Sequence, residues 1–214
     1  MLKRTSILQP ASQERLESLI TMRLKPGADK EHIDRRIWDL FGENWCIMFT
    51  DLAGFSRHVA RFGIIHFLQT IYESERVCVP VIEEHDGILL KAEGDSLLVI
   101  FRNVQKATLA AIEMQRRLRV YNDDKEDEEK VLLCVGLGFG RVLRIGDSDV
   151  FGAEVNAASK LGEDIAISHE ILVTRAFKDA VGGLPGVVFE ATEDDVPGAD
   201  GTFRARYEVS MPLP

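Results

Sequence analysis

Apolar residues fall into short continuous runs along much of the chain, and such runs predict buried strands. Cys46–Phe49 is entirely apolar, as expected for a central strand that is covered on both faces. Asp86-Gly87 predicts a turn, and Glu93-Gly94-Asp95 predicts the turn of a hairpin. Arg141–Ile145 is expected to pair back on the strand before it, after Gly140. The strands expected after the first one are Ile88–Lys91, Ser96–Phe101, Val131–Phe139, Ile171–Thr174 and Phe203–Val209.

Apolar residues at a spacing of three and four predict helices between these strands. Ile64–Glu84 is the longest, and Pro80 is expected to interrupt or end it, because proline lacks the N–H that a helix needs. Asn103 is expected to cap a helix that reaches Tyr121, and Ala153–Leu161 predicts another. The residues expected to face the core from the helix capped by Asn103 are Val104, Ala107, Ala111, Met114 and Leu118. Helices that alternate with hairpins indicate an α+β fold whose sheet is not wholly parallel.

Residues 1–42 are interpreted as an N-terminal helical extension, and residues 43–214 as one domain. Gln13–Leu24 has helical spacing, and Asp29 is expected to cap a second helix that reaches about Leu40. One face of this second helix carries Ile33, Ile37 and Leu40. We expect a helical cover packed on the core, and the alternative is a regulatory or dimer-forming element.

Composition excludes several classes of protein. The chain has 214 residues, of which 45% are hydrophobic and 29% charged, a globular profile with room for one sizeable core. Its net charge of −9 argues against a general nucleic-acid binder, which needs a positive surface to neutralise phosphates. The same charge does not argue against binding a nucleotide, since a bound metal can supply positive charge locally.

Neither a membrane span nor a secreted disulfide framework is indicated. The longest apolar runs, such as Ile88–Leu90 and Leu97–Phe101, are far too short to cross a bilayer, and the chain starts with polar sequence. Cys46, Cys78 and Cys134 are widely spaced in apolar sequence, which fits reduced, buried thiols. We therefore expect a cytoplasmic protein without contact to a membrane.

Asp51 is the first residue that indicates chemistry. It ends the predicted central strand and precedes a small, glycine-containing turn and a helix, which together offer backbone N–H groups to an anion. An acid beside a phosphate site indicates a cation between them, and magnesium binds through one or two carboxylates plus phosphate oxygens. Alone, Thr-Asp-x-x-Gly is a weak signal, because a carboxylate that caps the helix explains it too.

Two further elements strengthen the signal. Lys91-Ala92-Glu93-Gly94-Asp95 places a second acid beside a hairpin turn, where a simple surface turn is the alternative. In the segment 149–160, Asn156 and Lys160 stand four residues apart, so they project from one face of a predicted helix. An ordinary exposed helix face is the alternative for that pair.

Together these elements resemble the class III nucleotidyl (adenylate/guanylate) cyclases, of the compact-arm bacterial type, from about Trp45 to Thr174. Three ordered motifs are far more specific than any one of them. They are Phe49-Thr50-Asp51-Leu52-Ala53-Gly54-Phe55-Ser56, Lys91-x-x-Gly94-Asp95, and Asp149-x-x-Gly152-x-x-Val155-Asn156-x-Ala158-Ser159-Lys160.

The resemblance implies a ferredoxin-like, mixed and largely antiparallel sheet flanked by helices, with an active site between two such domains. In single-domain members a homodimer forms two equivalent sites. Asp51 and Asp95 would bind two Mg²⁺ or Mn²⁺ ions per site, and the Leu52 carbonyl would add a ligand. The backbone of Ala53, Gly54, Phe55 and Ser56 would hold the triphosphate. The implied reaction is attack of the ribose 3′-hydroxyl on the α-phosphate, with release of pyrophosphate.

The partner subunit would supply the other half of the site. Lys91 and Asp149 match the pair that recognises adenine, because a cation donates to the ring nitrogen while a carboxylate accepts from the exocyclic amine. Asn156 would orient the ribose, and Lys160 stands where the family usually has an arginine that stabilises the transition state. The implied function is an adenylate cyclase that makes cyclic AMP from ATP as a homodimer.

Three departures from the family pattern bear on this function. Lys160 keeps the charge of arginine but loses its planar fork, which predicts weaker transition-state stabilisation. Glu93 replaces a commonly apolar residue and is placed to form an ion pair with Lys91. The segment between Gly140 and Asp149 is short, so two subunits are expected to interlock less deeply.

Three alternatives remain open from the sequence. Related bacterial cyclases act on the pyrimidine nucleotides UTP and CTP, which keeps the reaction and changes the base. A catalytically weak, nucleotide-binding regulatory homologue is favoured slightly by Lys160 and Glu93, whereas the intact Asp51 and Asp95 pair argues against it. A polymerase-type phosphoryl-transfer enzyme ranks last, because Asp149 and Asn156 have no evident role in one.

Overall fold

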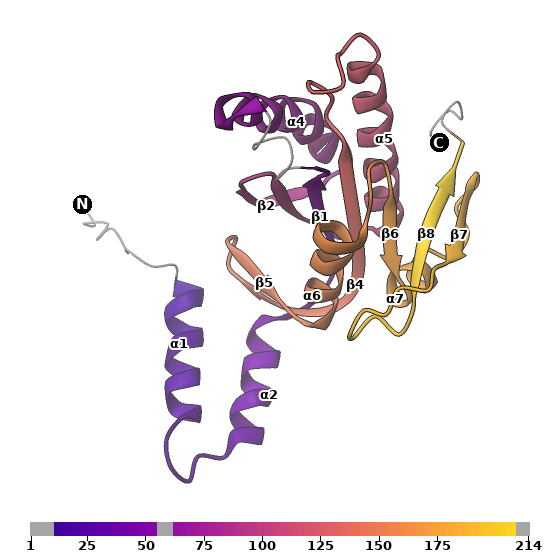
Figure 1. The fold of residues 1–214 in the computed structure, drawn as a ribbon. Coiled ribbons are helices and arrows are strands. Elements are labelled where there is room, and N and C mark those ends of the chain that lie inside the picture. Colours follow the sequence, from indigo (N-terminus) through magenta and orange to yellow (C-terminus); the bar gives the residue numbers. More distant parts are fainter. Residues whose placement is uncertain (1–10, 55–61, 209–214) are drawn as a thin grey trace, which may run out of the picture.

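A single mixed sheet organises the chain. The computed structural model describes residues 11–54 and 62–208, and within them eight strands form one sheet flanked by helices (Figure 1). The strands are β1 (Gly42–Leu52), β2 (Ile88–Glu93), β3 (Ser96–Phe101), β4 (Leu133–Ile145), β5 (Asp149–Phe151), β6 (Ile171–Thr174), β7 (Val187–Ala191) and β8 (Thr202–Tyr207). Their order is β2-β3-β1-β4-β6-β8-β7, and β5 pairs with the end of β4.

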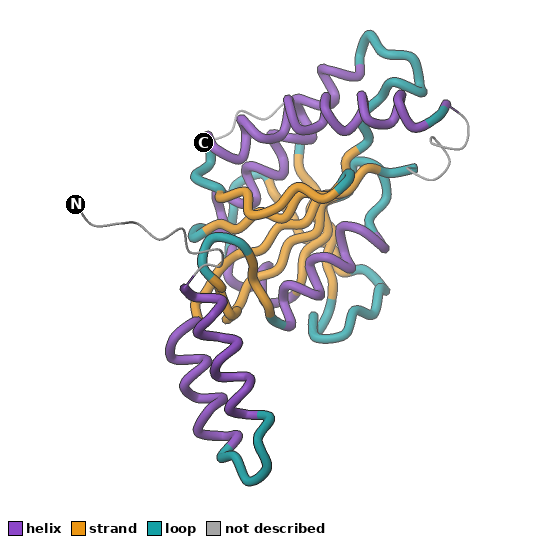
Figure 2. The backbone as a smooth tube through the Cα atoms, turned by 90° about the vertical axis from the view of Figure 1, so that its left-hand side faces the viewer, coloured by secondary structure: helices purple, strands orange, loops and turns teal. Residues whose placement is uncertain are grey.

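Helices connect the strands and cover both faces of the sheet (Figure 2). They are α1 (Ala11–Arg23), α2 (Lys30–Phe41), α4 (Ile64–Glu84), α5 (Val104–Asn122), α6 (Ala153–Ser159), a π-helical turn η1 (Lys160–Ile165) and α7 (Arg175–Val181). All strand pairs are antiparallel except β4 with β6, which run parallel. The predicted α+β fold with a mixed, largely antiparallel sheet is therefore confirmed.

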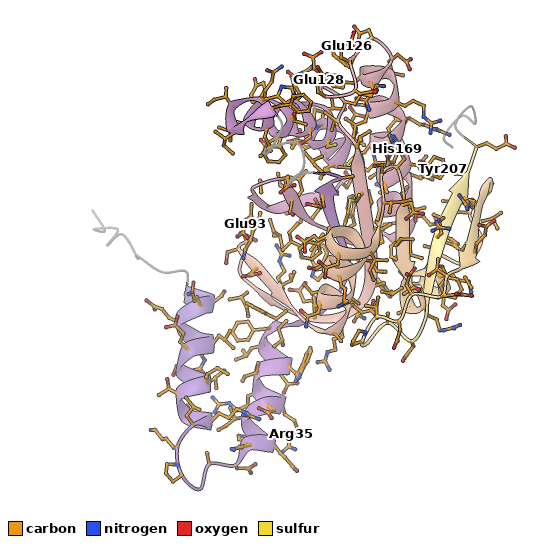
Figure 3. All side chains as sticks on the ribbon, viewed as in Figure 1. Arg35, Glu93, Glu126, Glu128, His169 and Tyr207 are labelled. Carbon is orange, nitrogen blue, oxygen red and sulfur yellow. The ribbon has the colours of Figure 1, made fainter. Side chains whose placement is uncertain are left out.

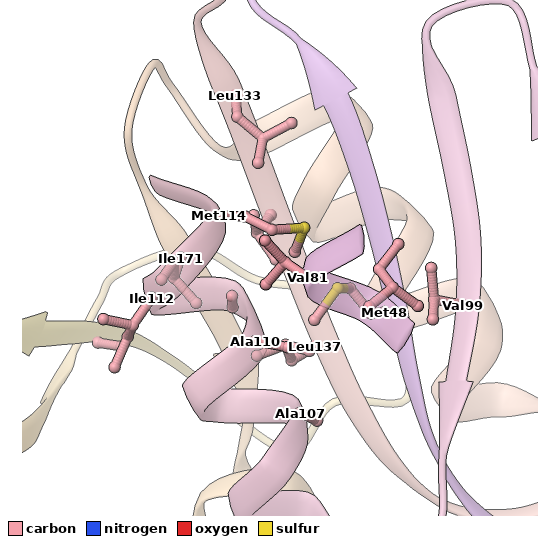
Figure 4. Close-up of a cluster of buried hydrophobic side chains, with 14 of the residues drawn as sticks. Met48, Val81, Val99, Ala107, Ala110, Ile112, Met114, Leu133, Leu137 and Ile171 are labelled. Atoms are coloured by element: carbon pink, nitrogen blue, oxygen red, sulfur yellow. The ribbon is translucent and has the colours of Figure 1, made fainter. Parts of the chain in front are cut away.

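Alternating residues of the central strands face two different cores. Cys46 and Met48 of β1 pack with α4, α5 and α7 in the larger core, part of which is drawn in Figure 4. Trp45 and Ile47 face the opposite side, where they pack with Val155 of α6. Since side chains alternate along a strand, Asp51 lies on the same side as Trp45 and Ile47. The chemistry expected at the end of β1 therefore faces α6.

Several element predictions needed correction. The expected pairing of Arg141–Ile145 back on the preceding strand is wrong, because β4 runs without a break through Gly140 and its far end pairs with β1 and β5. Pro80 lies inside α4 without ending it, since the flanking turns are buried against the sheet. Helix α6 ends at Ser159 rather than Leu161 and continues as the π turn. Elements absent from the prediction are α7, β5 and β7.

Helices α1 and α2 form a hairpin that projects beyond the sheet (Figure 1). Their apolar residues meet Leu143 and Ile145 of β4 in a small separate core, so the hairpin extends the end of β4 rather than covering the main core. Asp29 caps α2 as predicted, accepting a hydrogen bond from the His32 N–H at 2.9 Å. Leu40 was expected on the buried face and is 54% exposed; the i, i+4 series ends on buried Phe41 instead.

The helical hairpin and an acidic loop lie at opposite ends of the molecule (Figure 3). Arg35 marks the part of α2 away from the sheet, and the acidic loop with Glu126 and Glu128 lies at the opposite end (Figure 3). No helix among the described residues combines the length and the apolar character needed to span a bilayer.

A stripe of glycines on β4 brings helix α6 and η1 into contact with the strand backbone. Gly136, Gly138 and Gly140 alternate along β4, so all three face the α6 side. A Cβ atom on Gly136 would lie 2.1 Å from the Ala158 carbonyl oxygen and 2.4 Å from the Gly162 nitrogen. Any side chain at that position would push the helix and the turn away from the sheet.

Gly136→Ala is expected to destabilise the fold by about 1–3 kcal/mol, the usual cost of overpacking a tight contact. Gly183→Ala is the matched control, because a Cβ atom there meets nothing within 4 Å. Urea denaturation of both variants measures the difference. An effect of Gly136→Ala as small as that of the control, within about 0.5 kcal/mol, would contradict the close packing of α6 on β4.

Candidate active site

Two carboxylates meet where β1 ends beside the β2–β3 hairpin. Asp51 stands next to Thr50, whose register partner on β3 is Leu97, and Asp95 lies in the turn that precedes this strand. The Ser96 hydroxyl donates to Asp51 Oδ1 at 3.3 Å. The antiparallel pairing of β1 with β3 therefore brings together the two acids that the sequence analysis selected as metal ligands.

The electrostatics of this pair favour a cation. Burial raises the pKa of Asp51 to about 7, and the nearby negative charge of Asp95 adds to the effect. Burial also raises the pKa of Asp95, with a contribution from the charge of Glu163. Two carboxyl groups that resist ionisation together are stabilised as carboxylates by a divalent cation, because the cation offsets their repulsion.

The available ligands suit a magnesium or manganese ion that also binds water and substrate, rather than a metal coordinated entirely by protein side chains. Within residues 11–54 and 62–208, no cluster of three or more His, Cys, Asp or Glu side chains is arranged to hold a metal. Magnesium usually keeps several waters and binds through one or two carboxylates plus substrate phosphates. Asp51 and Asp95, with the Leu52 carbonyl next in the chain, fit that pattern of ligands.

A β-bulge turns Lys91 toward the α6 side of the sheet. The register between β2 and β3 shifts between Leu89, which pairs with Val99, and Lys91, which pairs with Leu98. Without the shift, Lys91 would face the same side as Leu89, toward the larger core. The bulge instead places the lysine on the side of Leu98.

Lys91 then meets Asp149 of β5. Its Nζ donates to Asp149 Oδ2 at 2.7 Å, and Glu93 Oε1 lies 3.9 Å from the same nitrogen. The carboxylate of Asp149, as hydrogen-bond acceptor, is the main cause that raises the pKa of Lys91. The two residues expected to recognise a base are therefore adjacent, and Glu93 is the weaker partner of Lys91.

This ion pair lines a pocket of about 250 Å³. Apolar side chains and three carboxylates surround the single lysine. The lining residues are Phe49, Lys91, Glu93, Ser96, Leu98, Asp149, Val150, Val155 and Glu163. Ser96 contacts both this pocket and Asp51, so the pocket and the carboxylate pair of one chain are neighbours on the same face.

Asn156 and Lys160 are exposed on the outer side of α6 and at the start of η1. Neither side chain has a hydrogen bond or ion pair within the part of the chain that the structure describes. They do not line the pocket around Lys91. Within one chain, the structure does not bring this pair together with Asp51 and Asp95.

The expected phosphate-binding segment is described only in part. The Ala53 N–H donates to the Leu132 carbonyl at 2.8 Å, so a phosphate oxygen would have to compete for this donor. Gly54 has φ +89°, a conformation that favours glycine, whereas Phe55 and Ser56 lie outside the described residues.

Two further residues, Ser96 and Glu163, lie at the site and were not predicted from the sequence. Ser96 follows Asp95 directly, and its position on a strand beside β1 is a signal that was available. Glu163 reaches the pocket only because η1 is a π turn that rests on the sheet. Its Oε2 accepts a hydrogen bond from the Ser159 hydroxyl. No periodic pattern in the sequence indicates a π turn.

Comparison with known proteins decides the family. The model of the adenylate and guanylate cyclase catalytic domain matches residues 41–196. The chain belongs to this family. The matched region begins at Phe41, the last residue of α2, so α1 and the rest of α2 precede it.

Two curated relatives share part of this cyclase domain. The chain is 30% identical over 134 residues to a serine/threonine-protein kinase, pkn2, of Myxococcus xanthus, covering 63% of this chain and 16% of the kinase. It is 27% identical over 160 residues to putative adenylate cyclase 3 of Rhizobium meliloti, covering 75% of this chain and 26% of the relative. The chain thus spans about a quarter or less of the length of these relatives.

Solved cyclase structures share the fold. An adenylate/guanylate cyclase/hydrolase from Silicibacter pomeroyi superposes with a TM-score of 0.64 at 23% identity, over 77% of this chain and 95% of that one. The adenylyl cyclase CyaB from P. aeruginosa superposes with a TM-score of 0.65 at 17% identity, over 78% and 95% of the two chains. These likenesses establish the cyclase fold of the chain as described in Figure 1.

Asp51→Asn is expected to stabilise the metal-free protein at pH 8 more than at pH 4. The raised pKa of Asp51 means that stability falls as pH rises from about 4 to about 7, where the folded carboxyl group ionises against burial and Asp95. Asparagine does not ionise, so the variant does not lose this stability. Thermal unfolding at several pH values measures the difference, because a change of about 1 kcal/mol in the free energy of unfolding shifts the melting temperature by about 2–4 °C for a chain of this size.

Asp127→Asn is the control, because Lys130 lowers the pKa of that exposed carboxyl group, so the substitution gives no gain at pH 8. Added Mn²⁺ is expected to raise the melting temperature of the wild-type protein and not that of Asp51→Asn. An equal response of both proteins to Mn²⁺ would place the cation elsewhere.

Proposed function

We propose that the chain is an adenylate cyclase, which converts ATP to 3′,5′-cyclic AMP and pyrophosphate at sites shared by two copies. The observation that carries this proposal is the adjacent donor and acceptor in the pocket, Lys91 Nζ and Asp149 Oδ2 at 2.7 Å. Adenine presents the complementary pair, a ring nitrogen that accepts beside an exocyclic amine that donates. Guanine and uracil present a carbonyl oxygen and a ring N–H instead, so the same orientation would leave them mismatched.

Cytosine is the chemically closest rival, because its ring nitrogen and exocyclic amine repeat the adenine pattern. A pyrimidine cyclase that uses CTP is therefore the second candidate, ahead of one that uses UTP. The pocket volume of about 250 Å³ does not discriminate between the two rings, and apolar side chains form part of its lining. Glu93, at 3.9 Å from Lys91 Nζ, adds acceptor character, which favours a base with an amine over one with two carbonyl groups.

Asp51 and Asp95 fit two Mg²⁺ or Mn²⁺ ions, with the Leu52 carbonyl as a further ligand. When bound, these metals lower the pKa of the ribose 3′-hydroxyl and offset charge on the phosphate oxygens. The two carboxylates would hold the cations at the end of β1, next to the turn that would bind the triphosphate. Their shared resistance to ionisation in the metal-free state supports this role, since metal binding relieves it.

Asn156 and Lys160 would act from the second copy, where Asn156 orients the ribose and Lys160 stabilises charge in the transition state. Their exposure without a partner in the described part of the chain supports a role toward a group outside this chain. Lysine offers a point charge rather than a fork, so we expect slower turnover than an arginine would give.

Helix α4 offers a surface to which a second copy of the chain could bind. Helix α4 exposes apolar side chains along one face, and such clustered exposure marks interaction surfaces. The exposed residues are Ile64 at 54%, Ile65 at 76%, Leu68 at 53% and Tyr72 at 65%. They support assembly as a homodimer, in which the half-sites of the two chains combine.

The cytoplasm is the proposed location. Cys46, Cys78 and Cys134 are free and buried, which suits a reducing compartment that also supplies ATP.

A catalytically weak regulatory homologue is the alternative function from another class, and Lys160 in place of arginine favours it.

Product identification after incubation with all four nucleoside triphosphates and Mn²⁺ tests the function. We expect cyclic AMP and pyrophosphate from ATP, at a higher kcat/KM than the product from any other nucleotide. Asp95→Ala should lower turnover at least about a hundredfold, because the metals supply several kcal/mol. Faster turnover of CTP or UTP would overturn the adenine assignment, and nucleotide binding without pyrophosphate release would favour the regulatory homologue.

Mixing Asp51→Ala chains with Lys91→Ala chains tests the shared site. Each variant destroys a different half, so half of the dimers formed from equal amounts are hybrids with one intact site. Activity should recover to about a quarter of the wild-type value. Asp51→Ala mixed with Asp95→Ala is the control and should recover nothing, since both changes fall in the same half. Equal recovery of activity in both mixtures contradicts a composite site. Absence of recovery in both mixtures contradicts it as well.

A further inference from the structure

A half-buried carboxylate takes the place of a missing strand beside β4. Strand β6 pairs with β4 only from Val135 to Leu137, after which its chain turns into α7. The next outward N–H of β4, on Phe139, would lose its partner there. Glu154 of α6 fills the position, and its Oε2 accepts from the Phe139 N–H at 3.1 Å.

The same oxygen ties α6 to the start of α7. The Thr174 hydroxyl donates to Glu154 Oε2 at 2.7 Å and also accepts from the Phe177 N–H at 3.2 Å, which caps α7. One carboxylate oxygen thus joins three elements, α6, β4 and the corner between β6 and α7.

The glycines of β4 make this contact possible. A Cβ atom on Gly138 would lie 2.6 Å from the Glu154 carbonyl oxygen and 2.9 Å from its Oε2. On Gly140 it would lie 2.9 Å from Glu154 Cγ. The strand surface therefore fits Glu154 closely, and a side chain at either position would force Glu154 to shift from its place.

Asn156 follows Glu154 on α6, Lys160 begins η1 directly after it, and neither has a side-chain partner within the described residues. No contact within the described residues holds these two side chains, so their positions relative to a substrate depend on where the backbone of α6 and the start of η1 is placed. A displacement of about 1 Å at a reacting centre can cost about a hundredfold in rate. The anchor of α6 on the sheet is the interaction that would control such a displacement.

We propose that Glu154 is a positioning residue that holds α6 against β4 so that Asn156 and Lys160 reach the nucleotide in the reactive geometry. This role rests on the proposed cyclase function. Glu154 itself is not catalytic, because its carboxylate is engaged between α6 and the sheet, away from the exposed face that carries Asn156. Since both donors meet a single oxygen, a glutamine can accept both hydrogen bonds in its place.

Three variants of the 214-residue chain test the proposal. Glu154→Ala removes the acceptor, Glu154→Gln retains one, and Asn103→Ala is a stability control that removes the cap of α5 at a distance from α6. The measurements are kcat and KM for ATP per folded molecule, the melting temperature, and hydrogen exchange of peptides that cover residues 153–165 without nucleotide.

Glu154→Ala is expected to lower kcat about tenfold to hundredfold with KM changed less than about threefold, since Asn156 and Lys160 act in the transition state. Exchange over residues 153–165 should accelerate. Glu154→Gln should stay within about threefold of the wild-type kcat. Asn103→Ala should lower the melting temperature and leave kcat unchanged.

A Glu154→Ala variant with wild-type kcat would overturn the positioning role, as would a Glu154→Gln variant as slow as Glu154→Ala. A loss of kcat in Asn103→Ala equal to that in Glu154→Ala would reduce the effect to general stability. A wild-type chain that forms no cyclic nucleotide overturns the proposed function instead. Hydrogen exchange then still decides the inference, because unchanged exchange over residues 153–165 in Glu154→Ala contradicts an anchor.

Discussion

Helix α6 and the π turn lie on the backbone of β4 itself, and the positions of Asn156, Lys160 and Glu163 depend on this close packing. The alternating glycines of β4 leave no side chains between helix and strand, and a Cβ atom on Gly162 would lie 2.8 Å from the carbonyl oxygen of Phe49, two residues before Asp51. The turn thereby carries Glu163 into the neighbourhood of Asp95. Asn156 on α6 and Lys160 at the start of the π turn are exposed on the outer side. A larger distance between α6 and β4 would displace Glu163, Asn156 and Lys160 at the same time.

Charge is distributed unevenly over this framework. The pocket holds one lysine against the carboxylates of Glu93, Asp149 and Glu163, and the adjoining pair of Asp51 and Asp95 adds two more acids. An anionic triphosphate approaches such a surface favourably only together with cations. The acidic character that argues against nucleic-acid binding is therefore compatible with a metal–nucleotide substrate, because the metals reverse the local sign of the charge.

Local signals were sufficient to predict that the carboxylates of Asp51 and Asp95 lie near each other. Asp51 ends an apolar strand and Asp95 sits in a hairpin turn, and both positions follow from residues close by in the sequence. Lys91 is different, because a strict alternation from Leu89 would turn it toward the larger core, and only the bulge directs it to Asp149. Gly140 suggested a chain reversal, whereas its true role depends on Glu154 of another element. Contacts of this kind are set by tertiary packing, which periodicity does not encode.

Lys160 shows how the framework and the chemistry combine. It stands where α6 passes into the π turn, and π turns within helices often occur at functional positions. The backbone there is held on both sides, by Glu154 on β4 and by Gly162 on β1 and β4. A lysine on this rigid support has a long, flexible stem and a single charged nitrogen, whereas an arginine presents a planar fork with directed donors. Anchoring the backbone removes part of the positional uncertainty that the flexible side chain introduces, so a firmly held α6 matters more for a lysine than it would for an arginine.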